Sequence, residues 1–158
     1  MAIRVAVDAM GGDHAPSAII RGATQALSDD PDLEVILVGD EGTIHRELSS
    51  IDVAATASRI RVVHASQVVG MDEQPVEALK TKKDSSLVRM TALAADGQAD
   101  AVLSAGNTGA CAAAAQFLLK PLPCVTRPGI AVTIPSFYGP FVLCDVGANI
   151  QAKPRHLY

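Results

Sequence analysis

The stretch VLSAGNTGACAAAA, residues 102–115, joins an apolar run to a row of alanines through Ser-Ala-Gly-Asn-Thr-Gly. This is the pattern of a β-strand that turns into a helix. Gly106 and Gly109 bracket Asn107 and Thr108, and glycines so placed indicate that some group approaches the backbone closely. The first N–H groups of a helix form an anion site, so we expect that group to be inorganic phosphate or a phosphoester. The alternative is an ordinary helix cap.

Working outward from this unit, strand and helix patterns alternate along the chain. Strands are predicted at 3–7, 33–38, 60–63, 101–103, 130–134 and 141–144. Helices are predicted from Pro16 to about Leu27, through Ile44 and Leu48, after the opening 71–75, behind a Ser85 or Ser86 cap, and over the alanines. The alternation predicts an α/β fold with three layers, a mostly parallel sheet flanked by helices.

The composition changes after Lys120. The stretch PLPCVTRPG at 121–129 is rich in proline and is predicted to be a connector. We predict a first α/β domain at 1–120 that carries the phosphate-site loops. Residues 121–158 are then the connector and the start of a second α/β domain.

Composition excludes several classes of protein. The chain has 158 residues, 49% of them hydrophobic, and a net charge of −4, which argues against a nucleic-acid-coating surface. Cys111, Cys124 and Cys144 show no CxxC spacing and are expected to be reduced thiols of a cytoplasmic protein. The four histidines show no metal-ligand spacing. No dinucleotide fingerprint or P-loop motif is present, so we expect no metal and no cofactor.

Four polar loops follow predicted strands, and the carboxyl ends of parallel strands meet at one edge of a sheet, where ligands bind. The loops are 8–13, 39–40, 104–109 and 145–149. The candidates for binding phosphate or substrate in them are Asp8, Gly11, Gly12, Asp13, Ser104, Gly106, Thr108, Gly109, Asp145 and Asn149. The alternative is that Asp8 and Asp13 are turn and cap residues only.

Lys82 and Lys83 precede a predicted helix capped by Ser85 or Ser86. A lysine near the N-terminus of a helix is repelled by the positive end of the helix dipole, and a bound anion would neutralise both positive charges. The alternative is that both lysines belong to a solvated surface.

Four blocks of this sequence, taken together, resemble a known family. They are VAVDAMGGDHAP at 5–16, MDEQPVEALKTKKDSS at 71–86, ADAVLSAGNTGA at 99–110 and DVGAN at 145–149. Their order is that of the PlsX family, the phosphate acyltransferases of bacterial phospholipid synthesis. The resemblance implies a fold like those of isocitrate and isopropylmalate dehydrogenases, with a cleft between two α/β domains, and a homodimer.

The resemblance also implies transfer of a fatty acyl group from acyl carrier protein to inorganic phosphate. The resemblance further implies that the product, acyl phosphate, is handed to a glycerol-3-phosphate acyltransferase, and that the protein associates peripherally with the inner face of the membrane. The catalytic candidates are Lys82, Lys83, Asp84 and Asn107, and Ser85 joins the binding set. The cysteines need no catalytic role, because phosphate is already an anionic nucleophile.

Two departures from the family pattern stand out. Family members are more than twice this length, so a chain of 158 residues is expected to bind phosphate but to form little acyl phosphate. After DVGAN, Gln151 and Arg155 replace the family's usual acidic residue and Glu. Two alternatives stay open: a phosphotransacetylase acting on acyl-coenzyme A, and a phosphate-binding module without turnover.

Overall fold

The computed structural model describes residues 2–123, 125 and 129–147. The chain divides into two compact units, Met1–Leu119 and Lys120–Tyr158, and each is described by itself. That these units are a first α/β domain and the start of a second stays a prediction.

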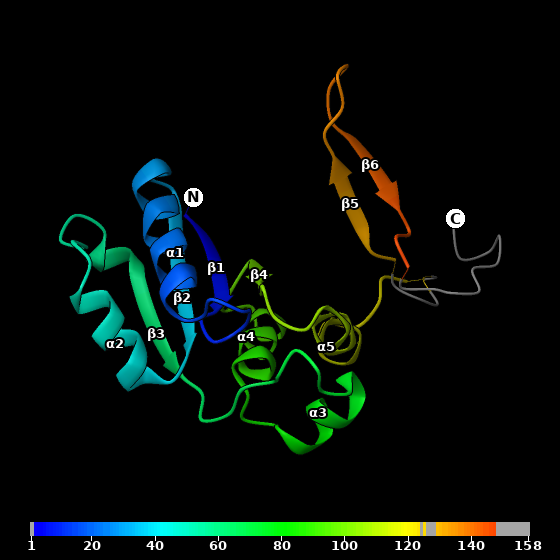
Figure 1. Cartoon of the computed structure of the whole chain (residues 1–158), viewed down its shortest axis with the longest axis horizontal. Helices are drawn as coiled ribbons and strands as arrows, with labels where there is room; N and C mark the ends of the chain where they lie inside the picture. Colours follow the sequence, from blue (N-terminus) through cyan, green and yellow to red (C-terminus); the bar gives the residue numbers. More distant parts are fainter. Residues whose placement is uncertain (1, 124, 126–128, 148–158) are drawn as a thin grey trace. The chain divides into compact units, whose positions relative to one another are not determined.

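The first unit is built on a parallel sheet. Its strands and α-helices in chain order are β1 (Ile3–Asp8), α1 (Ser17–Asp29), β2 (Leu33–Gly39), α2 (Glu41–Ser49), β3 (Ile60–His64), α3 (Pro75–Thr81), α4 (Ser86–Ala95), β4 (Ala101–Leu103) and α5 (Thr108–Ala114). A 3₁₀ turn, Ala57–Arg59, precedes β3, and a π-helical turn, Ala115–Leu119, continues α5. The strands lie in the order β3-β2-β1-β4 and all pair in parallel (Figure 1). In the register, Val5 of β1 faces Val35 of β2 and Ala101 of β4.

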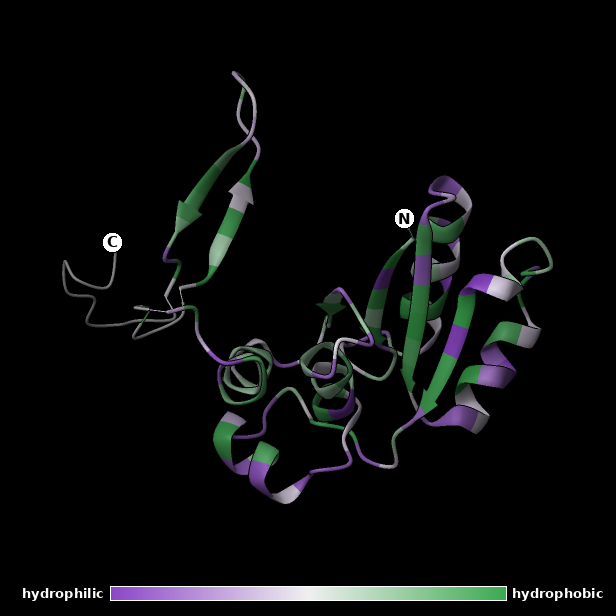
Figure 2. Cartoon of the chain, turned by 180° about the vertical axis from the view of Figure 1, so that it is seen from behind, coloured by the Kyte–Doolittle hydropathy of each residue, from purple (hydrophilic) through white to green (hydrophobic). Residues whose placement is uncertain are grey.

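Helices cover both faces of this sheet. On one face, Val7 and Leu37 pack with Ile20 of α1 and Ile44 of α2. On the other face, Ala6, Ile36 and Val38 pack with Met90 and Leu93 of α4. Successive strand residues point to opposite faces, so strands covered on both sides are apolar along most of their length, as Figure 2 shows. The predicted three-layer α/β fold is confirmed.

Three helices of the first unit begin at a side-chain cap. Asp40 accepts a hydrogen bond from the Thr43 N–H, Ser85 from Val88, and Asn107 from Ala110. Such caps satisfy N–H groups that have no partner within the helix. The predicted Ser85 cap is therefore confirmed.

Two predicted helix starts differ slightly from the structure. Helix α1 begins at Ser17, directly after Pro16, and α3 begins at Pro75, after the 71–74 segment. Proline lacks an N–H donor and is well suited to the first helical position, as at Pro75.

The second unit contains an antiparallel hairpin of β5 (Ala131–Ile134) and β6 (Phe141–Cys144). The prediction that Asp145 follows a strand of the parallel sheet is therefore wrong, because within the described residues β6 pairs with β5 in a separate two-stranded sheet. The tight Tyr138-Gly139 turn lets the chain reverse, which makes the two strands antiparallel neighbours. The predictions for Asn149, Gln151 and Arg155 lie outside the described residues.

Candidate functional site

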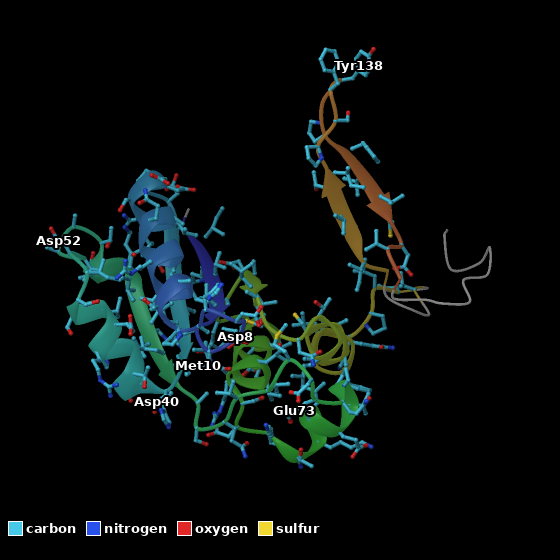
Figure 3. All side chains as sticks on the ribbon, in the orientation of Figure 1. Asp8, Met10, Asp40, Asp52, Glu73 and Tyr138 are labelled. Atoms are coloured by element: carbon cyan, nitrogen blue, oxygen red, sulfur yellow. The ribbon has the colours of Figure 1, made fainter. Side chains whose placement is uncertain are left out.

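The loops that follow the strands of the first unit gather at one end of the sheet. Figure 3 shows Asp8, Met10 and Asp40 at this end, whereas Asp52, which precedes β3, lies at the opposite end. Met10 lies directly over Gly39: a Cβ at that glycine would come within 2.6 Å of the Met10 Cγ. The three predicted loops of the first unit therefore share the carboxyl edge, as expected for parallel strands.

The loops after β1 and β4 are joined by a chain of hydrogen bonds. Ser104 donates from its hydroxyl to the Asp8 carboxylate at 2.8 Å, and the Gly106 N–H donates to the Ser104 hydroxyl at 3.1 Å. The other carboxylate oxygen of Asp8 accepts from the Met10 N–H at 3.1 Å. Asp8 is only 3% exposed, so these bonds replace the water that a buried carboxylate loses. Asp8 and Ser104 thus hold two loops 96 residues apart in one arrangement.

The glycines of these two loops are required by contacts within the chain. A Cβ at Gly106 would lie 3.2 Å from the Gly11 Cα, and one at Gly11 would lie 2.5 Å from an Asp8 carboxylate oxygen. Gly12 has a φ of +109° and faces the Ala105 carbonyl. The sequence indicates that some group approaches Gly106 closely, and the loop at 8–13 is one such group.

Asn107 ties the Ser104–Gly109 loop to the segment that precedes α3. Its side-chain oxygen caps α5, while its amide donates to the carbonyls of Gly70, Met71 and Glu73 at 3.0–3.2 Å. The residue is 7% exposed. Gly109 lies against the same segment, since a Cβ there would come within 2.8 Å of the Pro75 Cγ. Asn107 is proposed as a catalytic residue from the sequence, and these contacts give it a positioning role.

Lys82 is part of the same arrangement. Its ammonium group pairs with the Glu73 carboxylate and donates to the Val68 carbonyl at 2.8 Å. The Lys82 hydrogen bond, with a second from the Gly70 N–H, lowers the pKa of Glu73. Lys82 therefore already has an anionic partner, and any ligand anion at this point competes with Glu73.

Asp84 and Ser85 hold the start of α4. Asp84 accepts from the Ser66 backbone and hydroxyl and from the Arg89 guanidinium, and these bonds, that of the Ser66 hydroxyl first, lower its pKa well below the usual range. Ser85 is fully buried as the cap of α4. Both residues therefore have structural partners within the chain.

Three predicted residues keep polar groups available to a ligand. Asp13, Lys83 and Thr108 are exposed. Within the described part of the chain, none of the three side chains makes a hydrogen bond or ion pair. Of the predicted cations, Lys83 is thus the one without a partner among the described residues.

Sequence reasoning missed Glu73 and Ser66, which hold Lys82 and Asp84. Glu73 belongs to the quoted block at 71–86, so an acidic residue nine positions before a lysine was visible. Nothing in the sequence indicated that the intervening helix brings the two together.

Cys111 lies half-buried near this edge, and burial, followed by the nearby Asp8 charge, raises its pKa. A raised pKa leaves little thiolate at neutral pH and makes the thiol a poor nucleophile. Among the described residues, no group of three or more His, Cys, Asp or Glu is placed to hold a metal ion. No helix in the described part of the chain is long and apolar enough to cross a membrane.

Comparison with known proteins connects this chain to one family. The family model described as "Fatty acid synthesis protein" matches residues 3–158. Three relatives carry the name "Phosphate acyltransferase". The one from Streptococcus suis strain 05ZYH33 is 45% identical over 156 residues, that from Bacillus subtilis strain 168 is 46% identical over 156, and that from Methylococcus capsulatus is 46% identical over 154. In each case the match covers 98% of this chain and 45% of the relative, so the chain spans just under half the relatives' length.

Proposed function

This chain belongs to the fatty acid synthesis protein family, and on that premise we propose that its first unit binds inorganic phosphate for a phosphate acyltransferase. The acyl donor in this proposal is acyl carrier protein carrying a fatty acyl thioester, and the product is acyl phosphate for phospholipid synthesis. The observation that supports it most directly is the linked pair of glycine loops after β1 and β4 at the carboxyl edge. The name shared by the relatives supports the reaction class.

The reaction places modest demands on a protein. A phosphate oxygen attacks the thioester carbonyl carbon, the C–S bond breaks, and the thiolate leaves and takes a proton from water. The thiol formed has a pKa near about 8.5, so little acid catalysis is needed. The site must hold phosphate beside the carbonyl carbon and supply donors to the developing oxyanion, each worth about 3 to 4 kcal/mol.

Particular residues suit these tasks. The Thr108 hydroxyl and the Lys83 ammonium are exposed and unpaired among the described residues, so each can donate to phosphate without giving up another bond. Asp8, Ser104 and Asn107 keep the loops in place. Lys82 joins the ligand only if it exchanges Glu73 for phosphate. The proposal therefore divides the predicted set into ligand contacts and supporting residues.

The test is calorimetric titration of the chain with inorganic phosphate. Thr108→Val and Lys83→Met are expected to weaken binding several-fold without changing the thermal unfolding temperature, because neither side chain has a partner to lose. Lys80→Met is the matched control: Lys80 is exposed on the same segment and pairs with Glu77. Absence of phosphate binding, or equal weakening by all three variants, would contradict the proposed site.

The reaction itself is tested by hydroxylamine trapping of acyl phosphate from acyl carrier protein charged with a fatty acid. The test is made with a full-length relative that carries the Thr108 and Lys83 substitutions at the matching positions. Loss of product in these variants is expected. Product formed from acyl-coenzyme A but not from the carrier protein would favour the phosphotransacetylase alternative.

A further inference from the structure

An apolar cavity of about 380 Å³ lies between α1 and the sheet. Its lining comes from β1, β2 and β4 below and from one side of α1 above, and every lining residue is aliphatic or glycine. Apart from Ile19, the α1 side is made of small residues, among them Ala18, Gly22 and Ala26. In Figure 1, α1 lies over β2 and β1, while β4 lies beyond it at the edge of the sheet. Short side chains on the helix and an uncovered edge strand together leave this groove open.

The groove begins directly beside the candidate phosphate loops. Two of its lining residues, Val7 and Leu103, pair with each other in the sheet and immediately precede Asp8 and Ser104. Asp8 and Ser104 are the two residues that join the loops. Leu103 is 60% exposed, so apolar surface is open to water right next to a polar edge. A ligand with a polar head at the loops would have its apolar tail on this groove.

The length of the groove fits a medium-length hydrocarbon chain. Leu33, at its far end, is level with Ile3 in the register, four residues from the level of Val7. Four residues of strand span about 13 Å at roughly 3.3 Å each. In an extended zigzag hydrocarbon, each C–C bond of about 1.5 Å advances the chain by about 1.3 Å, so a chain of about ten or eleven carbons has a similar length. Ligand pockets of this size and apolar lining are typical of small-molecule sites.

We propose that this groove binds the hydrocarbon chain of a fatty acyl substrate, with the reacting carbonyl at the Asp8–Ser104 edge. The inference rests on the proposed function, because the acyl group is the substrate of that reaction. It adds the position of the hydrocarbon chain on the protein, and it predicts a preference for acyl groups whose length matches the groove. Burial of the methylenes contributes binding free energy away from the reacting carbon and so orients the carbonyl toward phosphate.

The structure provides a direct way to fill the groove. A Cβ at Gly22 would meet no atom within 4 Å, and replacing glycine inside a helix favours the helix. Gly22→Leu therefore adds a branched apolar side chain on the groove side of α1, starting from a Cβ that has open space around it. Gln25→Leu adds the same side chain to the same helix at a residue that is exposed and does not line the groove. Ala26→Leu fills the groove at a second point if Gly22→Leu fails to fold.

The experiment titrates the ¹⁵N-labelled chain with decanoate and follows the backbone amides by NMR. Shifts are expected at Gly22, Ala23, Ala26 and Leu103. Gly22→Leu and Ala26→Leu should weaken binding at least tenfold, and Gln25→Leu should bind like the unmodified chain. Absence of shifts at these amides, shifts concentrated elsewhere, or unchanged affinity in both groove variants would overturn the inference.

A phosphate titration of the same samples separates this inference from the proposed function. Phosphate binding without decanoate binding overturns the groove assignment and leaves the phosphate site standing; the groove is then a packing surface for another polypeptide segment. Decanoate binding at the groove without phosphate binding supports the groove and overturns the phosphate site.

Discussion

Asn107 shows how one side chain can organise a loop that the sequence assigns to a ligand. All of its hydrogen-bonding groups are directed to the chain itself: the oxygen to Ala110 and the amide to three carbonyls. A buried carbonyl that loses its donor is costly, because no water replaces it. We therefore expect Asn107 to contribute to stability more than to contact with substrate.

Substitution of Asn107 separates the cap from the amide. Asn107→Ser keeps a capping oxygen and loses the three amide bonds, and should lower the free energy of unfolding by about 2 kcal/mol. Asn107→Ala also loses the cap and should cost about 1 kcal/mol more. Urea unfolding measures both differences. Unchanged stability in Asn107→Ala would show that the carbonyls find other partners and that the positioning role is wrong.

Asp100 and Arg4 give the first unit a measurable acid sensitivity. The Arg4 guanidinium and backbone hydrogen bonds lower the pKa of Asp100 to about 2, against about 3.9 in an unfolded chain. A lowered carboxyl pKa stabilises the fold above about pH 4, and that stabilisation is lost as the pH falls toward 2. Both side chains are partly exposed, so the effect is modest.

Asp100→Asn should therefore be less stable than the unmodified chain at pH 7, and the difference in stability should shrink below about pH 4 and disappear as the pH falls through about 2. Urea midpoints across this range provide the measurement. The control is Asp52→Asn, because Asp52 is exposed and forms no ion pair among the described residues. A difference that stays constant with pH would exclude linkage through this carboxyl.

Helix α1 depends on a residue from outside the helix. It has no basic residue in its last turn, yet its end must satisfy carbonyls that have no partner within the helix. Arg59, in the short 3₁₀ turn Ala57–Arg59 before β3, donates to the carbonyls of Leu27, Asp30 and Leu33. One guanidinium thus fastens the α1–β2 connection to the start of β3.

Arg59→Met removes these charged donors and should lower the free energy of unfolding by about 2 to 3 kcal/mol. Arg59→Lys keeps the charge but not the fork of donors, so it should recover only part of the loss. The measurement is urea unfolding of the two variants. Full recovery by lysine would show that charge at the helix end, and not the three hydrogen bonds, stabilises α1.

The two units differ in how their strands are protected. In β2, every residue from Val35 to Gly39 is buried, because helices cover both faces of the sheet. In the β5–β6 hairpin, all four β6 residues are exposed, and the Phe137 and Tyr138 rings before the Gly139 turn are 97% and 96% exposed. A two-stranded hairpin by itself is only marginally stable in water.

Hydrogen exchange of the 158-residue chain should therefore be slowest in β1 and β2 and fastest, among the strands, in β5 and β6. Mass spectrometry of peptides covering 33–39 and 131–144 measures the difference, and the peptide covering α2 provides an intermediate reference. Equal protection of the hairpin and β2 would show that another surface covers the hairpin in solution.

The sequence by itself determined the strands and helices of the first unit and their parallel, three-layer arrangement, whereas the strand order β3-β2-β1-β4 is known from the structure. Apolar runs such as 33–38, ended by Gly-Asp and followed by a helix pattern, are local signals, and parallel strands joined by helices allow few topologies. For the same reason, the carboxyl edge and the loops 8–13 and 104–109 were predictable. In a parallel sheet, the loops that follow the strands all lie at the same edge.

Only the tertiary structure decided which partner each polar residue takes. Ser104 bonds to Asp8 across 96 residues, Lys82 pairs with Glu73, and Gly106 lies against Gly11. These contacts depend on side-chain directions and loop paths that residue types do not encode locally. The same holds for β6, whose apolar sequence fits a parallel strand equally well but which pairs antiparallel with β5. The apolar pattern of a strand indicates how far the strand is buried. Which strand it pairs with, and in which direction, is set by the path of the chain between the two strands.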